Sequence, residues 1–384
     1  MTKIQDGGLR VQPVTTKRDR QVLVCFPWRV YRNDPQWVPP LIHQRERQLD
    51  PERGSFFGHG EAAPFVARRG DEVVGTVVAW INHRSNAHLK EKAAGFGFFE
   101  VLEDYPIAEA LLTAACDWAR SRGMEVIRGP FYFSMDDSPG VLIKGFDQPQ
   151  VVLMGHTPPY YADFIERFGM EKYRDAYAYR GDLAILEGDI ANIPRKILRI
   201  AEAVRKRAKV TIRKVRMDDW DNEVTLVMDI FNQALGHMRN HVPMDETEFR
   251  RFADGLRALL DPEMVLIAEV AGRPVGFSVT LPDVNRALKH VNGRLSPLGL
   301  LKLWWYRRRI NVASFKILGV LEEYRGRGID VLLYVETARQ LLANGYEWID
   351  FSLVAENNVM MNRMVQRMEV LYVYRHYRTY QKAL

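Results

Sequence analysis

The stretch from residue 315 to residue 345 constrains the fold of this chain more than any other. Residues 315–321 are apolar on both alternations, which is typical of a strand covered on both faces. Beyond four residues of alternating arginine and glycine, apolar side chains recur at helical spacing, namely Val331, Val335, Ala338 and Leu342, with Tyr334 and Leu341 widening the stripe. Gly345 is a natural end for that helix. The segment is therefore predicted to be a strand, a glycine–arginine turn and a helix.

The turn in this segment, Arg325-Gly326-Arg327-Gly328, has the composition of an anion site. The first backbone N–H groups of a helix lack internal partners, and the helix dipole places partial positive charge there. The two glycines remove side chains that would block a close ligand, and the two arginines add charge. We predict that the turn holds phosphate groups. The alternative is a glycine-containing turn whose arginines are solvated.

Length and composition indicate the class of protein. A chain of 384 residues is too long for one ordinary core, so two domains are expected. The net charge of +6 suits an anionic ligand without requiring one. Cys25 and Cys116 lie far apart in the sequence, which indicates reduced thiols and a cytoplasmic location. The N-terminus has no apolar signal region and no apolar run reaches ~20 residues, so no membrane span is expected.

The order of predicted elements runs through the chain twice. In the first half we expect strands at 9–14, 63–69, 73–82, 96–102, 125–128 and 172–183, and helices at 16–32, 41–49, 107–122 and 160–168. A basic helix at 193–208 follows. The second half then has strands at 210–217, 264–270, 274–281, 315–321, 348–353 and 371–382, and helices at 219–234, 245–260 and 358–368, besides the helix after the turn.

Short sequence matches support two copies of one unit. Residues 101–105 match residues 320–324, and residues 123–127 match residues 345–349, in the same order and at near-constant spacing. The three extra residues of the second copy fall at Arg325-Gly326-Arg327, so the phosphate turn is what the first copy lacks. We predict a degenerate domain at 1–185, a linker helix at 186–208 and an anion-binding domain at 209–384.

The second half resembles the GNAT superfamily of acyl-CoA-dependent N-acyltransferases, whose loop reads Gln/Arg-x-x-Gly-x-Gly/Ala. The matching stretch here runs from Arg325 to Asp330. The resemblance implies that loop amides hold the pyrophosphate of CoA, that pantetheine lies between two splayed strands, and that an N–H on the fourth strand contacts the thioester. The cofactor-binding positions it implies are Leu318, Val320, Leu321, Arg325, Gly326, Arg327, Gly328, Ile329, Asp330 and Asn358.

The whole chain looks like a tandem GNAT protein, an arrangement also used by N-myristoyltransferases and FemABX-type peptidyl transferases. The expected fold is α/β (α+β), with two GNAT-like domains that each have a mixed, mostly antiparallel sheet flanked by helices. Two positions depart from the family pattern. Asp330 stands where glycine or alanine is usual, and Val365 aligns with the usual tyrosine acid. The acid must therefore come from elsewhere, and Tyr372 is the candidate, beside Tyr374 and Tyr377.

Acyl transfer to an amine needs a polarised carbonyl, a base for the ammonium proton and two reactants held together. Glu322 and Glu323 follow the fourth strand and are candidate bases, although a solvated acidic pair is the alternative reading. Asp283 also follows a strand and could face the cleft. His237 and His241 are four apart but lack the acidic neighbours of a zinc motif, so no metal is expected.

The insertion at 285–309 contains a run of tryptophan, tyrosine and arginine at 302–309. We expect a helix that packs its aromatics on the core and leaves its arginines solvated. A lipid interface, a nucleic acid or an acyl chain are the alternative contacts for this run. The basic run at 195–216 is likewise expected to be a solvated helix face and strand.

Three functions follow as hypotheses. The first is an N-acyltransferase, with acetyl-CoA or another acyl-CoA as donor and a small-molecule or peptide amine as acceptor; acetyl is the expected group, and nucleic acid is not an expected partner. The second is a FemABX-type transferase using aminoacyl-tRNA. The third is a catalytically silent CoA-binding or scaffold protein. For the phosphate turn we predict that Gly328→Glu abolishes CoA binding and leaves the fold intact.

Overall fold

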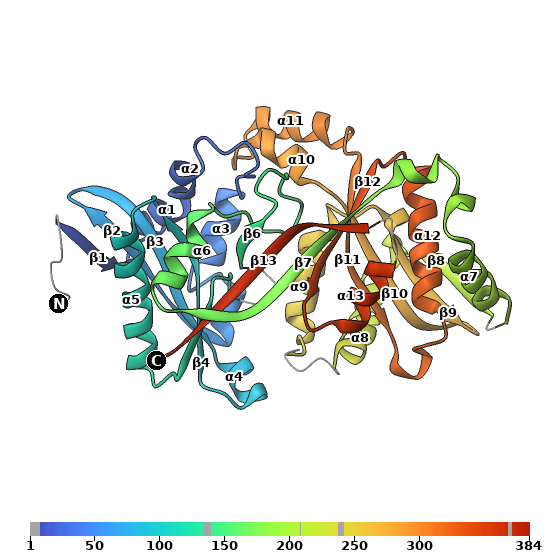
Figure 1. Cartoon of the computed structure of the whole chain (residues 1–384), viewed down its shortest axis with the longest axis horizontal. Coiled ribbons are helices and arrows are strands. Elements are labelled where there is room, and N and C mark those ends of the chain that lie inside the picture. Colours follow the sequence, from blue (N-terminus) through green and yellow to red (C-terminus); the bar gives the residue numbers. More distant parts are fainter. Residues whose placement is uncertain (1–7, 134–139, 208, 237–241, 368–370) are drawn as a thin grey trace.

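A single mixed sheet runs through the whole molecule (Figure 1). The computed structural model describes residues 8–133, 140–207, 209–236, 242–367 and 371–384. Its 13-stranded sheet has the order β1-β2-β3-β4-β5-β13-β7-β12-β11-β10-β9-β8, and β6 pairs with β13 beside this path. All neighbouring strands are antiparallel except two pairs, β4 with β5 and β11 with β12. The predicted class, mostly antiparallel sheet flanked by helices, is confirmed.

The strands of the first half are β1 (Leu9–Pro13), β2 (Gly60–Arg69), β3 (Glu72–Asn82), β4 (Ala93–Val101), β5 (Val126–Gly129), β6 (Val141–Lys144) and β7 (Glu171–Asp182). Its helices are α1 (Lys17–Cys25), α2 (Pro27–Val30), α3 (Ile42–Gln48), α4 (His83–Leu89), α5 (Tyr105–Ser121) and α6 (Tyr160–Arg167). Pro27 divides the helix predicted over 16–32 into α1 and α2, because a proline cannot donate an intrahelical hydrogen bond.

The strands of the second half are β8 (Val210–Lys214), β9 (Val265–Val270), β10 (Arg273–Pro282), β11 (Val312–Val320), β12 (Trp348–Ala355) and β13 (Leu371–Ala383). Its helices are α7 (Arg195–Arg207), α8 (Trp220–Leu235), α9 (Glu246–Arg257), α10 (Asn285–Leu288), α11 (Pro297–Arg307), α12 (Ile329–Ala343) and α13 (Val359–Arg367). Residues 315–345 therefore form a strand, a turn and a helix, as predicted.

The two halves repeat one topology and exchange strands. Read from either end, the sheet has four antiparallel strands, a fifth parallel to the fourth, and then two long strands. Those last two, β7 and β13, are shared. β7 pairs with β12 of the second half, and β13 pairs with β5 and β6 of the first half. Figure 1 shows β13 (red) running beside β7 (green) from one half into the other.

Because β7 and β13 pair with strands of the other half, the predicted domain boundaries do not divide the sheet. The molecule has two large hydrophobic cores, one beneath α5 and one beneath α12, but Tyr380 of β13 joins the first core, and Ala201 and Val204 of the segment 186–208 join the second. The division into 1–185, 186–208 and 209–384 remains a proposal, in which each unit is completed by a strand from its neighbour.

Helix α12 is covered on two sides. Its residues Ile329, Leu332 and Leu333 are buried in the core over the sheet, together with Val335. Helix α7 packs against it from outside, where Ala201 and Val204 join the same core. The stripe predicted from the sequence included Val335 and Leu341 but missed the two leucines, because a helix between a sheet and a second helix buries more than one face.

Candidate active site

Strands β11 and β12 are paired over only the first half of their length. They pair in parallel only through residues 312–315 and 348–351. The register between β10 and β11 shifts between Val279 and Thr280, which makes Lys316 the extra residue of a β-bulge. Beyond this bulge β11 continues to Val320 without β12 beside it. The sheet therefore opens a gap at the carboxyl end of β11.

The edge of β11 at this gap carries main-chain donors. The N–H of Leu321 donates to the carbonyl of Val275 at 2.9 Å. Because bonded pairs alternate along an antiparallel ladder, the N–H groups of Leu318 and Val320 point away from β10, toward the gap. Of the three strand positions predicted to bind the donor, Leu318 and Val320 thus present their N–H groups and Leu321 does not.

The turn after β11 forms the start of α12. Gly326 and Gly328 both adopt positive φ, +70° and +81°, which side-chain-bearing residues avoid. Gly328 is the N-cap, and the first intrahelical bond runs from the N–H of Leu332 to its carbonyl at 3.0 Å. The amides of Ile329 and Asp330 therefore lack helical acceptors and carry the positive end of the dipole.

The two arginines of the turn have different surroundings. Arg325 is partly buried, and its guanidinium donates to the carbonyls of Ala234 at 2.5 Å and Val320 at 3.3 Å. It fastens the turn to the end of α8. Arg327 is exposed, and its guanidinium lies 5.1 Å from the ring centroid of Tyr324. Arg327 is therefore the arginine whose charge is accessible to a ligand at the turn.

Gly328 also has a packing role. A Cβ atom at this position would come within 2.9 Å of Val204 and 3.0 Å of Ile200, both on α7. Gly328→Glu therefore stays a prediction, and we now expect it to disturb the packing of α7 on α12 as well as the turn, because α7 side chains would have to shift. Gly326 is the cleaner position to perturb, since its Cβ would meet no heavy atom within 4 Å.

Four further predicted residues lie around the turn and the strand ends. Glu322 and Glu323 are exposed, and Glu323 pairs with Arg273 at 2.9 Å. Asn358 caps α13 by accepting the N–H of Met361 at 3.1 Å. Tyr372 is 50% exposed, and its hydroxyl donates to Asp182 at 3.2 Å. Their proposed roles in catalysis and binding stay predictions.

A buried polar network lies where the pairing of β11 and β12 ends. Asp350 of β12 is fully buried and accepts hydrogen bonds from Ser314, from Ser352 at 2.6 Å and from Tyr374 at 2.8 Å. The ammonium of Lys316 lies 3.4 Å from the same carboxylate and donates to Ser352 at 2.8 Å. This network was not predicted from the sequence. The sequence signal for it was a charged residue within each of two apolar strand segments, Lys316 in 315–321 and Asp350 in 348–353.

Burial shifts the protonation equilibria of this region. Desolvation lowers the pKa of Lys316, against the opposing attraction of Asp350 and Asp283. The pKa of Tyr374 is raised well above its ordinary value, first by burial and then by Asp350. Asp283 has a pKa raised to about 6 by burial, although Arg286 and the N–H of Val152 bind its carboxylate. A lysine with a lowered pKa therefore sits beside the unpaired edge of β11.

Sequence comparison identifies the family. A model of the acetyltransferase (GNAT) family matches residues 28–129. The bacterial ceramide synthase of Caulobacter vibrioides is 32% identical over 386 residues, covering 99% of this chain and 98% of that protein. The chain belongs to the GNAT family. Protein YghO of Escherichia coli is 31% identical over 383 residues, covering 97% of this chain and 95% of that protein.

Solved structures show the tandem arrangement. A tandem GNAT protein from the clavulanic acid biosynthesis pathway superposes with a TM-score of 0.56 at 14% identity, over 98% of both chains. A GCN5-related N-acetyltransferase from Sphaerobacter thermophilus gives a TM-score of 0.54 at 14% identity, over 99% of this chain and 97% of that one. At such identities the likeness concerns the fold, which is that of a tandem GNAT protein.

The first GNAT unit differs at the corresponding gap. The hydroxyl of Tyr161 on α6 accepts the N–H of Val101 at 2.9 Å and donates to Glu100 at 2.8 Å. Tyr160 donates to the carbonyl of Val101 at 2.8 Å. Tyrosines thus cover the strand edge that stays unpaired in the second unit, and α5 begins at Tyr105 without a glycine turn. Burial raises the pKa of Glu100 to about 7.

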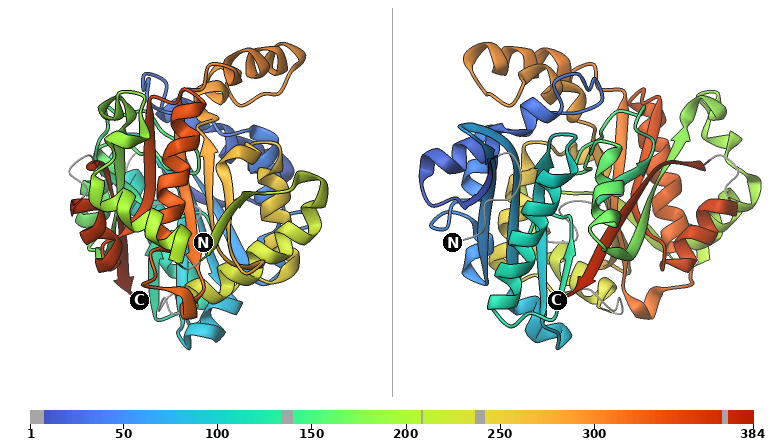
Figure 2. Two further views of the ribbon diagram at one scale, coloured as in Figure 1. Left: turned by 90° about the vertical axis from the view of Figure 1, so that its right-hand side faces the viewer. Right: turned by 60° about the vertical axis from the view of Figure 1, so that its left-hand side comes forward.

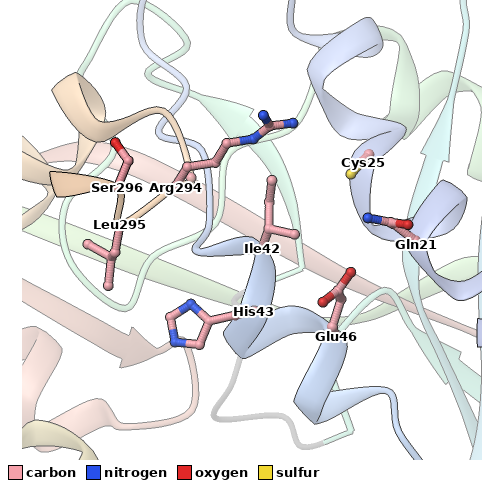
Figure 3. Close-up of a pocket in the computed structure, with 9 residues that line it drawn as sticks. Gln21, Cys25, Ile42, His43, Glu46, Arg294, Leu295 and Ser296 are labelled. Carbon is pink, nitrogen blue, oxygen red and sulfur yellow. The ribbon is translucent and has the colours of Figure 1, made fainter. Parts of the chain in front are cut away.

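Two other features concern ligands. A cavity of about 560 Å³ lies between α1, α3 and the segment before α11, and Arg294 extends across it toward α1 (Figure 3). Within the described ranges no three His, Cys, Asp or Glu side chains are placed to hold a metal ion. His237 and His241, which the sequence analysis considered, lie outside those ranges.

Proposed function

We propose that this GNAT protein transfers an acyl group from an acyl-CoA thioester to an amine, and that its second unit binds the donor. The observation that carries the proposal is the coincidence of three features at one place. The sheet opens between β11 and β12, unpaired N–H groups line the opening, and the glycine turn before α12 lies at the end of the same strand. No counterpart of all three is found in the described part of the first unit.

The chemistry follows from the groups at the gap. The N–H groups of Leu318 and Val320 would polarise the thioester carbonyl and stabilise the oxyanion that forms when the amine attacks. Attack by the amine forms the C–N bond and gives this tetrahedral oxyanion; its collapse restores the carbonyl, breaks the C–S bond and releases the thiolate of CoA. The attacking nitrogen must lose a proton, and the group proposed to accept it is Lys316, the β-bulge residue of β11, whose pKa burial lowers.

The proposed acceptor comes from the name of one relative, the bacterial ceramide synthase of Caulobacter vibrioides. A ceramide is the amide of a long-chain amino alcohol with a fatty acid, and the bacterial ceramide synthase matches this chain along nearly its full length. We therefore propose a fatty acyl-CoA as the donor and a long-chain amino alcohol as the acceptor. Acetyl transfer, the group expected from the sequence, is the competing specificity.

A CoA-binding protein without turnover is the second candidate. The position aligned with the usual tyrosine acid, Val365, is fully buried in a hydrophobic cluster, and Asp330 places a carboxylate in the first turn of α12.

If the protein does turn over acyl-CoA, the hydroxyl of Tyr374 would replace the missing acid. Tyr374 is part of the buried network, whereas Tyr372 faces solvent.

The test is an assay of amide formation by mass spectrometry with parallel detection of the released thiol. Purified protein is given acetyl-CoA or a long-chain acyl-CoA, together with a long-chain amino alcohol or a short amine. The proposal expects amide and free CoA only when both chains are long. Equal turnover of acetyl-CoA and the short amine would contradict the acceptor assignment. Thermal stabilisation by CoA without thiol release from any pair would favour the second candidate.

A further inference from the structure

Helix α11 presents an apolar face to solvent. Leu298, Leu301, Trp304 and Trp305 are 73%, 60%, 51% and 50% exposed, and Leu300 is exposed beside them. Figure 2 shows the helix (orange) projecting beyond the rest of the chain in both views. The expectation that these aromatics pack on the core is wrong. We call these five side chains the α11 face.

The opposite side of α11 holds it to the protein. Gly299 is buried, and Leu303 and Tyr306 are partly buried at the same helical spacing. The ring of Tyr306 stacks on His290 with centroids 3.6 Å apart, and the hydroxyl of Ser296 caps the helix. The helix is therefore fixed by its small inner stripe, and its larger apolar side chains are left outside.

Basic side chains border the α11 face. Lys302, Arg307, Arg308 and Arg309 are all exposed, and no acidic residue occurs between residues 284 and 321. The guanidinium of Arg308 lies 3.7 Å from the ring centroid of Trp304, and that of Arg309 lies 4.7 Å from Trp305. Leucine and tryptophan flanked by lysine and arginine are the composition of helices that lie in a bilayer interface.

We propose that α11 docks this protein on an anionic lipid bilayer, with the α11 face in the acyl-chain boundary and the basic residues at the phosphates. The described helices include none long and apolar enough to cross a membrane, so the contact lies on the surface. The cavity of Figure 3 is lined by residues 293–296, directly before α11. The proposal concerns binding and does not rest on the proposed function.

Charge and area favour lipid over a second copy of the chain. In a symmetric dimer, the four clustered positive charges of one copy would face and repel those of the other copy, whereas anionic lipids attract them. The α11 face offers on the order of 500 Å² if its five side chains were buried completely, short of the roughly 800 Å² per partner in a stable dimer.

The experiment is co-sedimentation with vesicles of phosphatidylcholine, alone or mixed with phosphatidylglycerol. We expect binding to the mixed vesicles to be roughly tenfold or more tighter, because each basic residue near the surface adds to the attraction, and to weaken with salt. Trp304 and Trp305 should be quenched by lipids carrying bromine on their acyl chains, and the quenching should disappear in the Trp304→Phe/Trp305→Phe variant.

The variant Leu301→Ser/Trp305→Ser should lose vesicle binding and keep its unfolding temperature, since both side chains are exposed. The control Ile185→Ser/Phe252→Ser removes two exposed apolar side chains elsewhere and should bind like the wild type. Absence of binding by the wild type, or undiminished binding by the α11 variant, would overturn the proposal. So would a wild-type dimer in sedimentation velocity that the α11 variant converts to monomer without any vesicle binding.

Discussion

Replacing Gly326 by aspartate tests the phosphate turn without disturbing its packing. A Cβ at Gly326 meets nothing within 4 Å, so the new side chain enters solvent at the mouth of α12. The positive φ of +70° strains any side-chain-bearing residue by about 1–2 kcal/mol, and aspartate less than most. The substitution therefore costs some stability for a reason unrelated to CoA, and a matched control is needed.

Gly70 supplies that control. It has a φ of +62°, its Cβ would also meet nothing within 4 Å, and it lies in the turn between β2 and β3 of the first unit. Gly70→Asp therefore introduces the same charge and nearly the same strain far from the predicted CoA site. Both variants should show a similar decrease in unfolding temperature.

The effect on CoA binding can be estimated from Coulomb's law. A carboxylate about 5 Å from one phosphate charge costs about 3 kcal/mol at an effective dielectric constant of ~20 and about 1 kcal/mol in water. Gly326 is exposed, so salt and solvent bring the effect to about 1–2 kcal/mol, which is roughly a tenfold rise in the Kd for CoA. Calorimetric titration with CoA should show this rise for Gly326→Asp and no change for Gly70→Asp. Equal affinities in the two variants would refute the assignment of the turn.

Three further predictions follow from the same geometry. Lys316→Met should lower kcat by ~10²–10⁴ and leave the affinity for CoA unchanged. The control Lys17→Met, at an exposed lysine, should have the kcat of the wild type. A wild-type kcat in Lys316→Met would exclude Lys316 as the base. Arg325→Met should lower the free energy of unfolding by about 1–3 kcal/mol in urea titrations, because it leaves two carbonyls without their donor. Arg327→Met should weaken CoA binding in calorimetric titrations and leave the free energy of unfolding unchanged. Loss of stability in the Arg327 variant with none in the Arg325 variant would contradict these roles. Glu100 has a pKa of about 7 in the fold against 4.5 when unperturbed, so the stability it contributes below pH 4.5 is lost as the pH rises through 7. Glu100→Gln should therefore reduce the difference in unfolding free energy between pH 5 and pH 8 by up to about 3 kcal/mol, and an unchanged difference would contradict the shift.

Local patterns made the second unit predictable. The strand, turn and helix at 315–345 are each specified by residues near one another in sequence, and the same holds for most of the other elements. The repeat was visible because both copies keep the same short matches before and after their central helix. These are the properties that periodicity and turn residues encode directly.

Long-range pairing could not be predicted in the same way. The exchange of β7 and β13 depends on which strands meet in space, and the sequence of either strand alone does not specify its partners. The network around Asp350 joins residues from three strands, so no single stretch displays it. The sequence of α11 has apolar side chains on both sides of the helix, so it does not indicate which side the body of the protein covers.

Hydrogen exchange with and without CoA tests the central claim most directly. The account predicts that CoA slows exchange at the amides of residues 326–331 and of Leu318 and Val320, which lie at the turn and the unpaired strand edge of the second unit. Residues 101–107 of the first unit should exchange at the same rate in both samples. Protection of residues 101–107 with none at 326–331 would place the donor in the other unit and contradict the account.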